Sequence, residues 1–153
     1  MQSVPTMRHN PMKALVSERL ALHCLLAVFL ATTIFHVLVV TGVVPFGMVW
    51  GGRLRSHSQM LTFEAVSLTI TLLMLAAVAV KAGYVKLMVP QRVMTVVFGL
   101  MFLLFLVNTF GNLASKNELE KLLFTPLTLV LALLSLRVAV GSAGHRAGAG
   151  TAR

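Results

Sequence analysis

Glu64 is the side chain with the clearest chemical potential, because it is the only acidic residue inside a strongly apolar stretch of this chain. Ionisable groups within a membrane are costly to bury, and by default they indicate a functional site. The chemistry of such a carboxyl would be proton acceptance. In the alternative interpretation Glu64 is a structural partner for a nearby cation or amide, and we favour this structural role.

The polar residues expected near the same depth form a candidate cluster around Glu64, and they are His36, Asn108, Asn112, Arg53 and Arg55. From the helical rise, His36 would lie about 12 Å below the end of its helix and Glu64 about 5 Å below the start of the next. Direct contact between these two side chains would therefore require a tilt or an offset of the helices. Arg53 or Arg55, folding back from the connection, is at least as good a partner for the carboxyl.

Motifs of the common enzyme classes do not occur in the sequence. We find no Walker A, G-x-S-x-G, H-E-x-x-H or dinucleotide-binding glycine pattern. A Ser-His-Asp triad is impossible because the chain has no aspartate. We therefore assign no catalytic residue, and the sequence favours a protein that is not an enzyme.

Metal and cofactor sites are also disfavoured within one chain. The single cysteine, Cys24, cannot form an intramolecular disulfide or a cysteine zinc cluster. His23 and His36 belong to one expected helix, and at about 100° per residue they point in different directions. Because the other three expected helices carry no histidine, we predict no metal ligand and no cofactor. A haem held between two chains stays open.

The composition indicates that these residues lie in a membrane. Of the 153 residues, 58% are hydrophobic and 11% are charged, whereas about 25% of the residues of soluble domains are charged. A soluble fold of this size could not bury so much apolar surface, so lipid must be its solvent. The net charge of +9 comes from short basic clusters between apolar runs, a placement that favours anionic lipid head groups over nucleic acid as the partner.

Four apolar stretches are long enough to cross the bilayer as helices, since one span needs about 20 residues. They cover residues 20–44, 60–80, 93–111 and 119–140. The first run is too long for a signal peptide and no convincing cleavage site follows it, so we expect it to be retained. The predicted fold class is an all-α, integral membrane four-helix bundle.

The lysines and arginines concentrate in the N-terminal segment, in the second connection and near the C-terminus. By the positive-inside rule, both termini should therefore face the cytoplasm. We divide the chain into a cytoplasmic N-terminal segment (1–19), a transmembrane domain (20–140) and a tail (141–153). The tail is rich in glycine and alanine, and we expect it to be disordered.

Each expected helix carries a narrow line of polar residues at helical spacing. Examples are Glu64, Ser67 and Thr71 in the second helix and Thr125 and Thr128 in the fourth. Small and hydroxyl side chains mark packed interfaces between helices in lipid, although serine and threonine also bond back to their own helix. We expect these lines to meet in the middle of the bundle.

Trp50 lies in the first connection, where we expect it to be an interfacial anchor at head-group depth. The stretches WGGRL, FEAVSL, KAGYVK, NTFGNLASKNELE and FTPLT together resemble a family of small, uncharacterised bacterial integral membrane proteins with four predicted helices. The resemblance covers roughly residues 20–140. It implies a location in the bacterial inner membrane, and it implies no activity, cofactor or partner.

Three functions are consistent with these features. The favoured one is a non-enzymatic accessory or structural membrane protein. The first alternative is an oligomeric transporter of protons or a small solute, whose path Glu64, Asn108 and Asn112 would line; so short a chain would need a symmetric dimer. The second is a membrane redox or quinone-linked subunit that uses His36 and Glu64 for proton transfer. The expected partners are the lipid bilayer with its anionic head groups and a homodimer or larger membrane complex.

Overall fold

The computed structural model describes residues 16–50, 54–115 and 118–149, and within them the protein is all-α. Its elements are α2 (Glu18–Val40), the short 3-10 helix η1 (Phe46–Met48), α3 (His57–Ala82), α4 (Gln91–Leu113) and α5 (Glu118–Ala149). The first three long helices and residues Lys121–Gly141 of α5 are each long and apolar enough to cross a membrane. This confirms the predicted multi-pass membrane protein with four spans.

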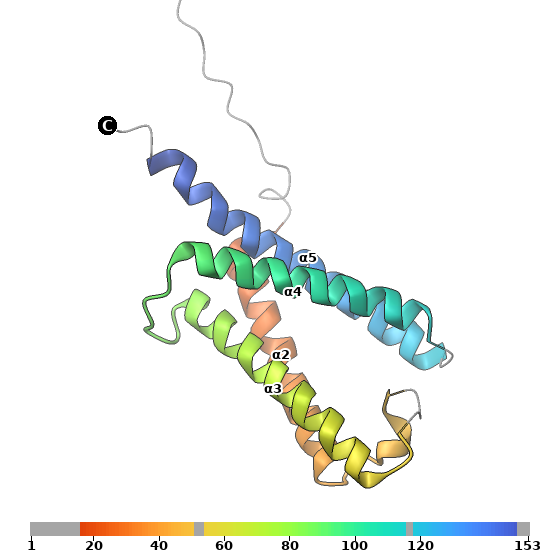
Figure 1. The fold of residues 1–153 in the computed structure, drawn as a ribbon. Helices are drawn as coiled ribbons and strands as arrows, with labels where there is room; N and C mark the ends of the chain where they lie inside the picture. Colours follow the sequence, from red (N-terminus) through yellow and green to blue (C-terminus); the bar gives the residue numbers. More distant parts are fainter. Residues whose placement is uncertain (1–15, 51–53, 116–117, 150–153) are drawn as a thin grey trace, which may run out of the picture.

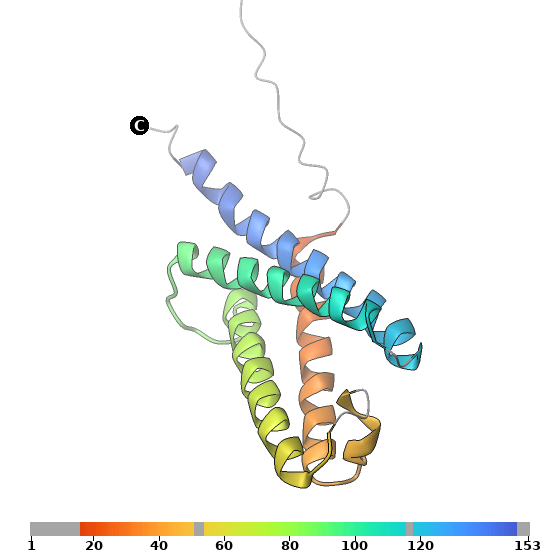
Figure 2. The same cartoon turned by 45° about the vertical axis from the view of Figure 1, so that its right-hand side comes forward.

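The four long helices form two helical hairpins, α2 with α3 and α4 with α5 (Figure 1). The hairpins meet where α5 crosses the N-terminal part of α2, and they diverge from there, as both views show (Figure 2). Helices α3 and α4 make few contacts although they follow each other in the chain. The arrangement therefore differs from the expected single bundle, because two pairs of helices are inclined to each other.

The main apolar core lies where the two hairpins meet, and each long helix contributes a fully buried residue to it. These residues are Leu25 in α2, Val78 in α3, Phe98 in α4 and Val138 in α5. The rings of Phe29 and Phe105 stack at a centroid distance of 5.9 Å and thereby join α2 to α4. Packing of this kind can hold two hairpins together in lipid, where helix association relies on van der Waals contact.

The outward faces of the helices are apolar along most of their length. Leu73 in α3 and Val107 in α4 each expose 67% of their surface, and Leu133 in α5 exposes 52%. Such side chains would be unfavourable in water but are compatible with surrounding acyl chains. Contact with a lipid bilayer follows from these faces together with the four spans.

Side-chain and backbone caps set the helix ends more exactly than hydropathy does. The hydroxyls of Ser17 and Ser56 accept bonds from backbone N–H groups in the first turns of α2 and α3. Helix α2 ends at Val40, four residues before the approximate end at residue 44 that hydropathy predicts. The reason is Gly42, whose positive φ of 79° takes the backbone out of the helical conformation.

Helix α3 ends at Ala82 with a Schellman motif. Gly83 has φ 85°, and its N–H bonds the carbonyl of Val80 while the N–H of Tyr84 bonds that of Ala79. Helix α5 reaches Ala149, beyond the boundary at residue 140 that the sequence predicts. Residues 150–153 of the expected tail and residues 1–15 of the N-terminal segment lie outside the described part of the chain.

Candidate functional site

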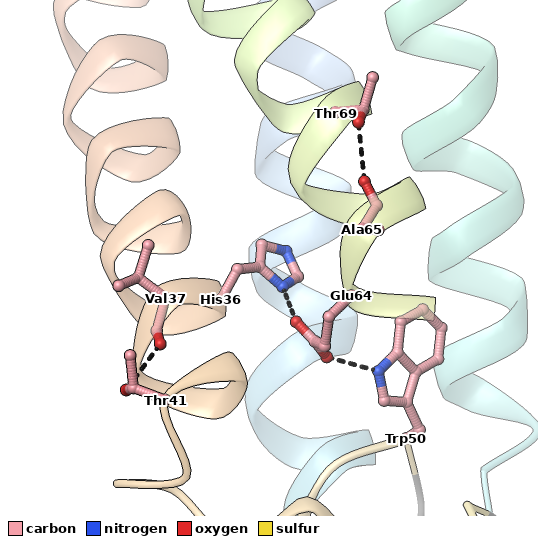
Figure 3. A network of polar contacts seen from close by, with 7 residues as sticks. All are labelled: His36, Val37, Thr41, Trp50, Glu64, Ala65 and Thr69. Atoms are coloured by element: carbon pink, nitrogen blue, oxygen red, sulfur yellow. Dashed lines mark hydrogen bonds and ion pairs between the residues drawn. The ribbon is translucent and has the colours of Figure 1, made fainter. Parts of the chain in front are cut away.

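Glu64 lies in the first turns of α3, and both of its carboxyl oxygens contact other side chains. Its Oε2 lies 2.6 Å from Nδ1 of His36 in α2, and its Oε1 accepts a hydrogen bond of 2.8 Å from Nε1 of Trp50. The two partners approach the carboxyl from opposite sides (Figure 3). We call His36, Trp50 and Glu64 the Glu64 cluster.

The carboxyl of the Glu64 cluster is buried, whereas the Trp50 residue is 40% exposed. Glu64 is 1% exposed and the His36 side chain 12% exposed. The connection between α2 and α3 covers the end of the hairpin, where Val39, Val49 and Met60 form a small buried apolar cluster of their own. Because the carboxyl itself is buried, its hydrogen bonds are electrostatically stronger than they would be in water.

Trp50 reaches Glu64 from an unusual backbone conformation. Its φ of 56° is in the left-handed region, which a bulky residue rarely adopts. Such a conformation costs on the order of 1–3 kcal/mol and persists only where contacts compensate for it. Here the compensation comes from the bond to Glu64 and from the ring of Phe63, whose centroid lies 5.1 Å from that of Trp50.

The structure brings together only part of the candidate cluster expected around Glu64. His36 contacts the carboxyl directly, so the offset between α2 and α3 that this contact requires is present. Arg55 is exposed, and its backbone N–H bonds the side chain of Gln59. Asn108 is exposed on α4. Arg53 lies outside the described residues.

Asn112 belongs to a second group of polar side chains, between α4 and α5. Its Nδ2 donates a bond of 3.4 Å to Oγ1 of Thr128, and the hydroxyls of Thr128 and Thr109 lie 2.9 Å apart. We call these three residues the threonine cluster. The polar lines of the helices therefore do not meet in one centre within the described chain, because each hairpin pairs its own polar groups.

Two other hydroxyls in the polar lines bond back to their own helix, whereas those of Thr125 and Ser135 in α5 are buried without a hydrogen-bond partner in the described chain. Thr32 and Thr33 donate to the carbonyls of Val28 and Phe29 within α2. Of Thr32, Thr33 and His36, which form the polar line of α2, only His36 reaches a second helix in the described structure. Sequence spacing identifies the face of the helix on which a threonine lies. It does not show whether the hydroxyl bonds to its own helix or to a neighbouring helix.

A third polar group, which sequence reasoning missed, lies where the hairpins meet. The Oε1 atom of Glu18 lies 3.3 Å from Nζ of Lys81 in α3, and Nε of Arg137 in α5 donates a bond of 2.8 Å to the carbonyl of Val16. Arg137 is only 9% exposed, and its Nη1 is buried without a hydrogen-bond partner in the described chain. These contacts connect α2, α3 and α5.

Gly141 in α5 fits between the charged groups at this junction. A Cβ atom at this position would lie 2.7 Å from both Nη1 of Arg137 and Oε2 of Glu18. We call Glu18, Lys81, Arg137 and Gly141 the junction cluster. The sequence carries a signal for it, since Arg137 interrupts an apolar run and Gly141 follows one helical turn later.

The described residues hold no group of three or more His, Cys, Asp or Glu side chains close enough to share a metal ion. His23, for example, has its Nε2 3.1 Å from the hydroxyl of Tyr84, far along the hairpin from His36. The chemistry that the arrangement offers is therefore that of the Glu64 cluster, a buried carboxyl held between an imidazole and an indole.

Comparison with known proteins does not identify a function for this site. No family model, no curated protein and no solved structure matches the chain. The bacterial family suggested by the sequence stays a prediction.

Proposed function

We propose that the protein is a non-enzymatic accessory protein of the bacterial inner membrane, in which the Glu64 cluster has a structural role. The observation that carries this proposal is that each carboxyl oxygen of Glu64 already has a partner within the protein. Both oxygens contact side chains of the same chain, and the residue is 1% exposed. A carboxyl used in this way fixes α2, α3 and their connection, and it offers no free oxygen to a substrate.

The remaining surface supports an accessory role. Side chains of the Glu64 and threonine clusters bond within the protein, whereas the outward faces of the helices are apolar. A protein of this design acts through lateral contact with lipids and other membrane helices. The location and the cytoplasmic placement of both termini are part of the proposal, and the distribution of basic residues supports them.

The structural role is tested by replacing Glu64 and measuring thermal unfolding of the purified protein in detergent. Glu64→Leu removes the acceptor of two side chains, so we expect a loss of about 2 kcal/mol, or roughly 4–8 °C in Tm. Glu118→Leu is the matched control, because the Glu118 side chain is 84% exposed. Equal melting temperatures for Glu64→Leu and the unmodified protein would overturn the structural role.

Proton-coupled transport is the second candidate function, and one distance favours it. Oε2 of Glu64 and Nδ1 of His36 are 2.6 Å apart, so a carboxyl and an imidazole can share one proton inside the protein. The test is proton or solute flux into liposomes. Glu64→Gln keeps the size of the side chain but cannot accept a proton. A flux that this variant loses while its folding is intact would support transport, and absence of flux in the unmodified protein would exclude it.

The proposed topology has its own test. A cytoplasmic reporter fused to the C-terminus should be active, whereas a periplasmic reporter at the same position should be silent. The reverse pattern would place both termini outside.

A further inference from the structure

An apolar groove of about 420 Å³ lies between α3 and α4. Its walls are apolar side chains of both helices, among them Ile70, Leu73 and Met74 from α3 and Val97, Leu100 and Leu104 from α4. The groove exists because α3 and α4 diverge after their connection and make few contacts. None of its lining residues is part of the Glu64 cluster or the threonine cluster.

The lining residues of the groove lie within two candidate membrane spans, within reach of a lipid tail that starts at the α3–α4 connection. Met74 is about 12 Å along α3 from the last residue of that helix, Ala82, and Val97 is about 9 Å along α4 from Gln91. One leaflet of the hydrocarbon core is about 15 Å thick. An acyl chain whose head group lies beside the α3–α4 connection therefore reaches the groove.

The α3–α4 connection has the character of a membrane-surface segment. Leu87 and Met88 are 62% and 94% exposed, although both are apolar. Two exposed cations, Lys86 and Arg92, lie on either side of them. Neither cation has an ion-pair partner within the described chain, whereas Lys81 is already paired with Glu18. Basic and apolar side chains together are suited to an anionic head group and the acyl region beneath it.

We propose that the α3–α4 groove binds one anionic phospholipid. One acyl chain occupies the groove between Leu73 and Leu100, and the phosphate and negative charge of the head group lie against Lys86 and Arg92. Charge complementarity at the connection selects this occupant over a second copy of the chain, whose apolar helix faces would leave the two cations unmatched. The site is independent of the accessory function proposed above.

Native mass spectrometry of the full-length protein with phosphatidylglycerol and phosphatidylcholine of identical acyl chains tests the site. We expect one tightly retained phosphatidylglycerol per protein and weaker retention of phosphatidylcholine. The double variant Lys86→Gln/Arg92→Gln should bind phosphatidylglycerol about 30-fold more weakly, since it removes two basic groups at an anionic head group. Lys121→Gln, which changes a half-exposed lysine on α5, should leave binding unchanged.

The acyl-chain part of the site is tested by filling the groove. Leu100→Trp should abolish the retained lipid, whereas Leu133→Trp, on an exposed face of α5 away from the groove, should keep it. Melting temperatures identify a variant that fails to fold, in which case Leu73→Phe provides a smaller obstruction of the same groove. Equal retention of the two lipids, or retained lipid in a folded Leu100→Trp variant, would overturn the proposal. A dimer that Leu100→Trp dissociates would assign the groove to a second copy instead.

Discussion

The indole of Trp50 donates its N–H to Glu64 across 2.8 Å, so the connection between α2 and α3 is bonded to the helix that follows it. This contact explains how a tryptophan can hold a left-handed backbone conformation. It also means that a residue expected to anchor the protein at head-group depth has its polar atom directed to the interior of the hairpin. The anchor role of its exposed part stays a prediction.

Fluorescence can follow this contact specifically, because Trp50 is the only tryptophan in the chain. In Glu64→Leu the indole loses its acceptor, and the connection is no longer held against α3. We expect quenching of Trp50 emission by acrylamide to increase. Glu118→Leu should leave quenching unchanged, and the same quenching in both variants would show that the bond to Glu64 does not hold the indole.

Gly141→Ala should destabilise the junction of the hairpins. The added Cβ would displace the guanidinium of Arg137, which is buried and already bonded to Val16, or the carboxyl of Glu18. We expect the free energy of unfolding to fall by about 1–2 kcal/mol despite the higher helix propensity of alanine.

Gly111→Ala is the matched control, because nothing lies within 4 Å of a Cβ at that position in α4. Replacing a helical glycine by alanine in open space stabilises by up to about 1 kcal/mol. Thermal unfolding of the two variants should therefore shift in opposite directions. A melting temperature of Gly141→Ala at or above that of the unmodified protein would contradict the role of this glycine.

The hydroxyls of Thr109 and Thr128 should show measurable coupling between α4 and α5. Hydrogen bonds between membrane helices average about 0.6 kcal/mol in double-mutant cycles, and we expect a value of that size for Thr109→Val with Thr128→Val. Thr69, which bonds the carbonyl of Ala65 in its own helix (Figure 3), supplies the control. Thr69→Val with Thr128→Val should be additive, and additivity of the first pair as well would argue against an interhelical bond.

The ion pair between Glu18 and Lys81 should contribute more than the exposed pair between Glu118 and Lys121. The Lys81 side chain is 16% exposed, whereas that of Lys121 is 41% exposed. We expect Lys81→Met to cost about 1–3 kcal/mol, between the limits for exposed and buried pairs, and Lys121→Met to cost less than about 1 kcal/mol. Chemical denaturation of both variants measures the difference, and equal costs would show that burial does not strengthen the first pair.

The membrane spans could be predicted from the sequence because hydropathy over about 20 residues depends on composition alone. The exact helix ends depend on single residues, such as Ser56 at the start of α3 and Gly42 after α2. The arrangement in two hairpins could not be predicted, because apolar faces of similar composition are compatible with several packings in lipid.

The sequence likewise predicts some features of the candidate site and not others. Glu64 and His36 were identified from their types and expected depth, and the structure places them in contact. The indole of Trp50 was missed as a partner, because its approach depends on a rare backbone conformation that spacing does not reveal. Asn112 was assigned to the same cluster, but the pairing of α4 with α5 directs it to Thr128. Depth can be estimated from sequence, whereas the choice of neighbouring helix cannot.

The division into two hairpins has a consequence for the order in which the chain assembles during synthesis. The contacts of Glu64 span at most 28 residues, and those of Thr128 with α4 span at most 19. The bond from Arg137 to Val16, by contrast, spans 121 residues. The N-terminal hairpin can thus enter the bilayer with its carboxyl already paired, before α4 and α5 have been made. The bond from Arg137 to Val16 requires α5, so this contact between the hairpins can form only after the fourth span has been made.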